Sequence, residues 1–186
     1  YTDQQHNGIE TVLKENVVCI TGLAGTGKSS LVDAMLEVFN GKYTVALAAL
    51  SGRAAVRMAE ITGQEGKTIH RLLGFPDTSS EAKNKYSYHD ENPLLYDIII
   101  IDEISMIGGR LFYSLLRAVA NGTKLILLGD IGQLESIGEC KVAADIIESA
   151  EIPTIVLDEI HRQAAKSAII TDSINMRKGI QIIEKD

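Results

Sequence analysis

A short segment from Gly22 to Ser29 fits the phosphate-loop pattern G-x-x-x-x-G-K-[ST] at every fixed position. Glycines let a backbone wrap closely around phosphate groups, because no Cβ blocks the approach. The loop N–H groups and the start of the following helix then point toward negative charge. In such a loop Lys28 would reach the terminal phosphates, and the Ser29 hydroxyl would bind Mg²⁺. The alternative is a glycine-rich turn before a helix with an exposed lysine.

A second group of reactive residues follows a run of four isoleucines at residues 98–101. Such a run predicts a strand buried on both faces, as in a parallel sheet. Two carboxylates at its end, Asp102 and Glu103, are costly to bury unless a cation or solvent meets them. Together with the phosphate loop they are typical of a Walker B strand, in which Asp102 holds Mg²⁺ and Glu103 orients and deprotonates the attacking water. The alternative is a helix N-terminus with acidic residues in its first turn.

These two motifs need elements that hold them at one edge of a sheet. Apolar runs predict strands at residues 17–20, 43–50, 97–101, 124–128 and 153–157. Helical spacing predicts helices that include residues 9–13, 30–39, 54–60, 111–119, 141–150 and 164–176. The alternation predicts an α/β fold with a mostly parallel sheet and helices on both faces. Residues 75–93 interrupt it, and Tyr86 and Tyr88 alternate as in a strand, so we interpret this stretch as a small inserted hairpin.

Two segments could bind a ligand but also have a plain structural interpretation. Thr2 and Gln5 have the spacing of a capping box, although the Gln5 amide could instead pair with the edge of adenine. Ser51, Gly52 and Arg53 follow a predicted strand, where ligands gather in open α/β sheets. Ser51 could equally cap the next helix and leave the arginine on the surface.

Two later segments also allow both a structural and a ligand-binding interpretation. Thr68 is typical of a helix N-cap, and a lone His70 is more often a packed or capping side chain than a ligand. Asp130 and Gln133 follow a strand, with Gln133 placed to sense a γ-phosphate. Taken alone, such residues are commonly turn residues.

The composition is that of one ordinary domain. The chain has 186 residues, of which 45% are hydrophobic, so it can bury a full core. No apolar run reaches the roughly 18 residues of a membrane span, and no basic-then-apolar leader is present, so we expect a cytoplasmic protein without a membrane partner. Two cysteines do not form a disulfide framework. The net charge of -7 argues against a protein that coats nucleic acid, but it leaves room for a local DNA groove.

Taken together, the segments resemble the first motor domain of RecD-like helicases of superfamily 1. That group includes the exodeoxyribonuclease V alpha subunit and the conjugative relaxase-helicases. The matching segments occur in the right order at residues 2–5, 22–29, 50–55, 67–74, 102–106, 129–134 and 161–163. The Asp-Glu-x-Ser-Met and Gly-Asp-x-x-Gln-Leu segments are far more specific than the phosphate loop alone.

The resemblance implies that residues 1–186 form a single RecA-like P-loop NTPase domain, with residues 75–93 as a pin hairpin that helps to part the duplex. It implies ATP and Mg²⁺ as cofactors and movement along single-stranded DNA, 5′ to 3′. The nucleotide-binding residues would be Gln5, Gly22, Ala24, Gly25, Thr26, Gly27, Lys28, Ser29 and Ser30. The catalytic residues would be Lys28, Glu103, Gln133 and Arg162, with Ser29 and Asp102 on the metal. The DNA-binding residues would be Ser51, Gly52, Arg53, Thr68 and His70.

Nothing after Gly179 matches the later helicase motifs of that family. We therefore expect the chain to be part of a longer protein whose second RecA-like domain completes the ATP site. Other repair or conjugation subunits could be further partners. Two alternatives stay open: a P-loop ATPase that does not move nucleic acid, and an inactive DNA-binding module that kept the fold.

Overall fold

A single parallel sheet organises the fold. The structure is a computed structural model that describes residues 2–23, 25–74, 86–130 and 140–158. Within these residues the sheet has six strands in the order β3-β2-β4-β5-β1-β6, and every neighbouring pair is parallel. The strands are β1 (Val17–Gly22), β2 (Val45–Ala49), β3 (Gly66–Thr68), β4 (Ile98–Asp102), β5 (Lys124–Gly129) and β6 (Thr154–Leu157).

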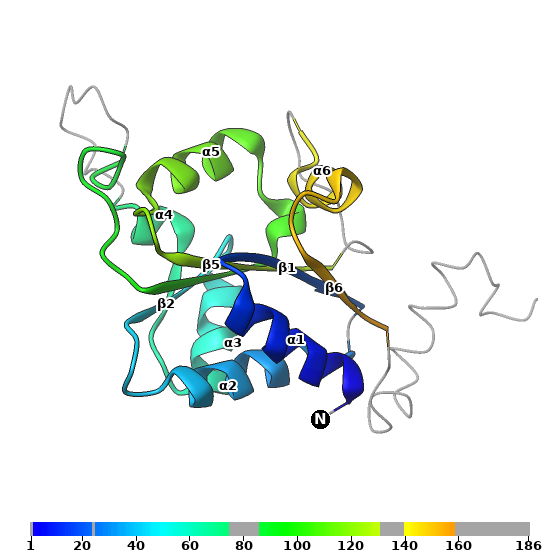
Figure 1. The fold of residues 1–186 in the computed structure, drawn as a ribbon. Coiled ribbons are helices and arrows are strands. Elements are labelled where there is room, and N and C mark those ends of the chain that lie inside the picture. The colour runs from blue at the N-terminus through cyan, green and yellow to red at the C-terminus, as the bar shows by residue number, and fades with distance from the viewer. Residues whose placement is uncertain (1, 24, 75–85, 131–139, 159–186) are drawn as a thin grey trace, which may run out of the picture.

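Helices cover both faces of the sheet, as the alternation of the sequence predicted (Figure 1). One face carries α1 (Asp3–Lys14), α2 (Lys28–Phe39) and α3 (Gly52–Thr62). The other face carries α4 (Ile69–Leu72), α5 (Gly109–Ala118) and α6 (Val142–Ser149). A short 3₁₀ helix, η1 (Ile104–Met106), follows β4 directly.

The four isoleucines of β4 show why helices must cover both faces of the sheet. Ile98 and Ile100 point into the core shared with α1, α2 and α3. Ile99 and Ile101 point into the core shared with α4, α5 and α6. All four are buried, and each contributes about 2 kcal/mol of hydrophobic stabilisation, so either face left open would expose several kcal/mol of apolar surface.

The five strands expected from apolar runs are present, and β3 is an additional one. With three residues, β3 is too short to show an apolar pattern. Its position depends on a close approach to α3, because a Cβ on Gly66 would lie only 2.2 Å from the carbonyl oxygen of Ala55. A strand determined by backbone proximity of this kind leaves no periodic signal in the sequence.

The helical spacing of Ile9, Val12 and Leu13 predicts one apolar face of α1, and the structure confirms it only in part. Leu13 is 53% exposed, whereas Gln5, Gly8 and Val12 are the buried residues of the helix. A polar residue and a glycine therefore occupy two of the three inward positions. Hydrophobic periodicity finds Val12 and the half-buried Ile9, but not the polar and glycine positions nearer the start of the helix.

The described part of the expected hairpin, residues 86–93, contains one isolated antiparallel bridge, between His89 and Asn92, and no regular strand. Tyr86 is buried and Tyr88 is exposed, whereas two residues that are two positions apart in a strand would lie on the same face, so the strand pattern predicted for these tyrosines is wrong. Residues 75–85 and the expected helix at 164–176 lie outside the described residues, so the pin hairpin stays a prediction. In the part of the chain that is described, no helix has both the length and the apolar character needed to cross a bilayer.

Candidate functional site

The phosphate loop joins β1 to α2 in a conformation that its glycines make possible. Gly25 and Gly27 have φ of 84° and 85°, in the left-handed region that residues with a Cβ adopt only at a cost. At Gly22 the limit is space, because a Cβ would lie 2.6 Å from the carbonyl oxygen of Leu157 and 2.6 Å from Thr26 Oγ1. The glycines of the pattern are therefore required by the backbone and by packing. Ala24, also expected to bind nucleotide, lies outside the described residues.

Lys28 begins α2 and turns back over the loop. Its Nζ donates to the carbonyl oxygens of Gly22, at 2.5 Å, and of Leu23, at 3.1 Å. Ser29 follows it in the first turn, and both side chains line one pocket. The ammonium group therefore lies where negative charge on a ligand of this loop would meet it.

The two carboxylates lie at the end of β4, in different environments. Burial raises the pKa of the Asp102 carboxyl, while the N–H of Glu103 and the nearby cations of Lys28 and Arg57 act in the opposite direction. The Glu103 N–H donates to Asp102 Oδ1 at 2.8 Å. Glu103 itself has φ of 60° and ψ of 38°, a left-handed conformation that costs a residue with a side chain on the order of 1 kcal/mol. This local strain turns the chain sharply and leaves the Glu103 carboxylate at the pocket.

Both motifs meet in the same pocket, as the sequence predicted. The order of the sheet explains this, because β5 alone separates β1 from β4, and the carboxyl ends of parallel strands lie at one edge. The polar residues of the pocket are Lys28, Ser29, Arg57, Thr62, Asp102 and Glu103, and its apolar wall is Val32, Met58, Ile61 and Leu128. The site thus offers two cations, two carboxylates and two hydroxyls around one space.

Arg57 is the charged pocket residue that sequence reasoning missed. It lies one helical turn after Arg53 on α3, and sequence alone indicated only a surface arginine there. The fold places it close enough to influence Asp102. Its spacing from Arg53 is the one available signal, but that signal does not say which way the helix faces.

Gln5 forms the capping box that the sequence suggested, and it also makes a contact with the phosphate loop that the sequence did not indicate. The capping box with Thr2 is complete: Thr2 Oγ1 accepts from the Gln5 N–H at 3.2 Å, and Gln5 Oε1 accepts from the Thr2 N–H at 2.9 Å. The other end of the amide, Nε2, donates to the carbonyl oxygen of Gly27 at 3.3 Å. Gln5 is fully buried, so it joins α1 to the phosphate loop, and adenine recognition stays a prediction.

The expected DNA-binding residues follow two neighbouring strands, β2 and β3. Ser51 and Thr68 each cap the helix that begins after their strand. Gly52 and Arg53 are exposed, and the His70 ring lies 6.2 Å from that of Tyr86. The structural interpretation of both caps is confirmed, and the DNA contacts stay predictions.

One contact links these residues to the pocket, since Ser51 Oγ donates to Glu103 Oε2 at 3.4 Å. Gln133 and Arg162, the expected γ-phosphate contacts, lie outside the described residues.

Comparison with known proteins places the chain in a family. Residues 1–184 match the family described as AAA domain. The ATP-dependent RecD2 DNA helicase of Deinococcus radiodurans is 35% identical, and the RecBCD enzyme subunit RecD of Mycolicibacterium smegmatis is 34% identical. The matches cover 96% and 78% of this chain, but only 24% and 30% of those two proteins, so the chain spans less than a third of either.

Solved structures agree in fold. The Pif1 helicase of Candida albicans matches with a TM-score of 0.71 and 28% identity, over 97% of this chain and 44% of that one. A Pif1 helicase from Bacteroides matches with a TM-score of 0.66 and 25% identity, over 95% and 46%. The sheet and its flanking helices are thus those of a RecA-like helicase domain, as predicted. The chain belongs to the family of AAA domains, and among known proteins it resembles the RecD and Pif1 helicases of superfamily 1.

Proposed function

We propose that this chain is the first motor domain of a longer DNA helicase, and that it binds and hydrolyses ATP with Mg²⁺. The observation that carries the proposal is the shared pocket of Lys28, Ser29, Asp102 and Glu103. The names of the relatives support it, since the protein from Deinococcus radiodurans is an ATP-dependent DNA helicase. Residues 1–186 form one RecA-like domain in this proposal, and a second such domain of the full-length protein completes the ATP site.

The residues present fit a nucleotide with its metal. The left-handed glycines form a loop of the kind whose N–H groups bind phosphates, and Lys28 adds a cation. Magnesium prefers oxygen ligands and keeps several waters, so it needs few protein groups. Among the described residues no cluster of three His, Cys, Asp or Glu side chains forms a ligand set. Ser29 and Asp102 would therefore hold the ion jointly with the nucleotide, and the ion would offset charge on the phosphate oxygens.

Each protein group has a defined task in this proposal. Lys28 exchanges the carbonyl oxygens of Gly22 and Leu23 for phosphate oxygens, which bind an ammonium group more strongly because they are charged. Glu103 orients the attacking water and accepts its proton. Its left-handed backbone directs the side chain to the pocket, where the hydroxyl of Ser51 contacts the carboxylate at 3.4 Å before any ligand arrives.

Single-stranded DNA is the proposed track, with movement from 5′ to 3′. The Bacteroides structure contains ADP-AlF3 and single-stranded DNA, which supports the assignment. In this chain the hydrogen bond from Ser51 to Glu103 joins the expected DNA segment to the expected base. A strand bound at Ser51–Arg53 would therefore act on Glu103 directly. Other subunits, such as those of a RecBCD-type complex, are proposed partners of the full-length protein.

The test is made on the full-length protein. Glu103→Gln keeps the shape of the pocket but removes the base, so ATP binding should persist while DNA-stimulated hydrolysis falls by about 100-fold or more. Lys28→Ala should weaken both binding and hydrolysis. Lys14→Ala is the matched control, because Lys14 is an exposed lysine of α1 that pairs with Glu10.

If Lys28→Ala leaves every activity of the full-length protein unchanged, the motor assignment of this domain is refuted, and a DNA-binding module whose own ATP site is inactive is favoured. If hydrolysis depends on Lys28 but is not stimulated by single-stranded DNA, the protein is a P-loop ATPase that does not move on nucleic acid.

A further inference from the structure

Among the charged residues that the structure describes in the nucleotide pocket, Arg57 alone has no task in the proposed function. It belongs to α3, which lies beside α2 on the same face of the sheet (Figure 1). Arg57, Met58, Ile61 and Thr62 all line the pocket, and their spacing places them on one side of the helix. One side of α3 thus forms a wall of the pocket, and Arg57 is part of that wall.

Arg57 lies toward the polar end of the pocket. The helix α3 joins the parallel strands β2 and β3, so it begins at the carboxyl edge of the sheet and runs back toward the amino ends. Arg57 is therefore nearer the carboxyl edge than Ile61 or Thr62. Asp102 and Glu103 lie at the same edge, and the charge of Arg57 acts on the Asp102 carboxylate. The guanidinium and the proposed base are thus at the same end of the pocket.

The order of the strands gives the pocket a direction. Starting from the phosphate loop after β1, the carboxyl edge passes β5, then β4 with Glu103, and then β2, which leads into α3. A triphosphate bound by the loop would extend toward Glu103, because the attacking water must meet the terminal phosphate there. Arg57 approaches that phosphate from the side opposite the loop.

The charges of the pocket indicate why a second cation is needed at this end. Asp102 and Glu103 are carboxylates, and the terminal phosphate that would lie beside them is also negative. With Lys28 as the sole cation, the pocket would carry net negative charge and would oppose an anion. Arg57 brings the pocket to two cations and two carboxylates. A guanidinium also stays charged and can bond two phosphate oxygens at once.

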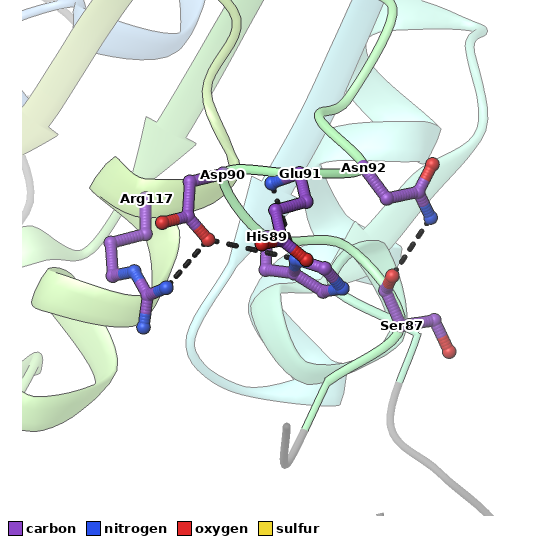
Figure 2. A network of polar contacts seen from close by, with 6 residues as sticks. All are labelled: Ser87, His89, Asp90, Glu91, Asn92 and Arg117. Atoms are coloured by element: carbon purple, nitrogen blue, oxygen red, sulfur yellow. Dashed lines mark hydrogen bonds and ion pairs between the residues drawn. The ribbon is translucent and has the colours of Figure 1, made fainter. Parts of the chain in front are cut away.

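The Arg57 side chain is exposed, and within the residues that the structure describes its guanidinium makes no hydrogen bond and no ion pair. Other cations have different surroundings. Arg117 Nη2 of α5 donates to Asp90 Oδ1 at 2.5 Å, as Figure 2 shows. Lys67 and Arg71 line a separate hollow beside β3, which has aromatic side chains and shares no residue with the nucleotide pocket. Arg57 can therefore bind a ligand of the nucleotide pocket without breaking a contact.

We propose that Arg57 binds the terminal phosphate of ATP and lets the pocket distinguish ATP from ADP. The proposal rests on the proposed function, because it assigns one more residue to the same site. Hydrolysis and release of the terminal phosphate remove the ligand of Arg57, while the phosphate loop keeps the rest of the nucleotide. Since residues 51–53 lie at the start of α3, the nucleotide state would reach the expected DNA segment through this helix.

The experiment measures nucleotide binding by the full-length protein, using isothermal titration calorimetry with excess Mg²⁺. The ligands are ADP and AMP-PNP, an ATP analogue that is not hydrolysed. Arg57→Gln should raise the Kd of AMP-PNP about 10-fold and leave that of ADP within about 2-fold of wild type, because the lost charged hydrogen bond involves the terminal phosphate alone. Arg57→Lys should lie between the two, since it keeps the charge and loses the paired geometry. Arg117→Gln is the matched control and should change neither Kd, because Arg117 lies outside the pocket.

The urea unfolding midpoint of Arg57→Gln should match that of wild type, because the guanidinium has no partner to lose. Equal weakening of both nucleotides would overturn the assignment to the terminal phosphate, and a lower midpoint as well would make Arg57 a structural residue. If both Kd values of Arg57→Gln match wild type, this role of Arg57 is wrong while the proposed function stands. A loss of single-stranded DNA binding in that case would assign Arg57 to the DNA segment instead. If the wild-type protein binds neither nucleotide, the proposed function fails with the proposal.

Discussion

Gln5 allows the sharpest separation of a structural role from a recognition role. Its amide accepts from the Thr2 N–H and donates to the Gly27 carbonyl, and the side chain is fully buried. Gln5→Ala removes both hydrogen bonds and leaves a void beside the phosphate loop. At about 1 kcal/mol for each hydrogen bond, the unliganded protein should lose about 2 kcal/mol of unfolding free energy. For a domain of this size that is a fall in Tm of about 4–8 °C.

Urea denaturation without nucleotide measures the loss of stability, and titration with ATP and with GTP measures the effect on nucleotide binding. Because Gln5 supports the loop at Gly27, we expect Gln5→Ala to weaken the binding of ATP and the binding of GTP by the same factor. Thr2→Ala is the control, since it removes the cap hydrogen bond to the Gln5 N–H and leaves the contact of Nε2 with Gly27 in place. That variant should lose about 1 kcal/mol of stability and bind nucleotide normally.

The reasoning fails if Gln5→Ala unfolds at the wild-type urea concentration. It also fails if the variant loses its preference for ATP over GTP at unchanged stability. The latter result would assign the amide to the adenine edge, which was the other interpretation of this residue.

Three further perturbations test the packing around the site. Gly66→Ala should lower the unfolding midpoint strongly, because the new Cβ would meet a carbonyl oxygen of α3 at 2.2 Å; an unchanged midpoint would refute that contact. Burial raises the pKa of the Cys19 thiol to about 11, so in the native protein Cys140 should react with a thiol reagent while Cys19 reacts at least about 100-fold more slowly. Hydrogen bonds from the Thr44 N–H and hydroxyl lower the pKa of Asp97, so this carboxylate stabilises the fold at neutral pH and loses its effect as pH falls through that lowered value. Asp97→Asn should therefore flatten the acid side of the stability curve measured by urea denaturation between pH 7 and pH 2, and an unchanged curve would contradict this role.

Sequence reasoning succeeded wherever one short segment carries its own physical requirement. The isoleucine run of β4 predicted a strand covered on both faces, and both cores exist. The spacing of Thr2 and Gln5 predicted a capping box, and the cap is present. Ser51 and Thr68 predicted helix starts that the structure confirms. Hydrophobic periodicity and caps are local, so a window of a few residues contains the whole signal.

Sequence reasoning stopped where a partner lies far along the chain. β3 exists because Gly66 can approach α3, and Arg57 enters the pocket because α3 packs against β2 and β3 next to α2. The contact of Ser51 with Glu103 joins residues 52 positions apart. No local pattern contains such a pair, because it depends on the order of strands in the sheet.

The sequence by itself determined the chemistry: a glycine loop that can surround phosphate, a lysine, a hydroxyl, and two carboxylates at the end of a buried strand. Only the tertiary structure decided that these groups meet, because β5 lies between β1 and β4 and brings their carboxyl ends to one edge. It also decided that the Gln5 amide donates a hydrogen bond to the phosphate loop, and that a hollow with cationic and aromatic side chains forms beside β3. The physical reason is that residue type fixes what a side chain can do, while backbone packing between distant segments fixes which side chains it can reach.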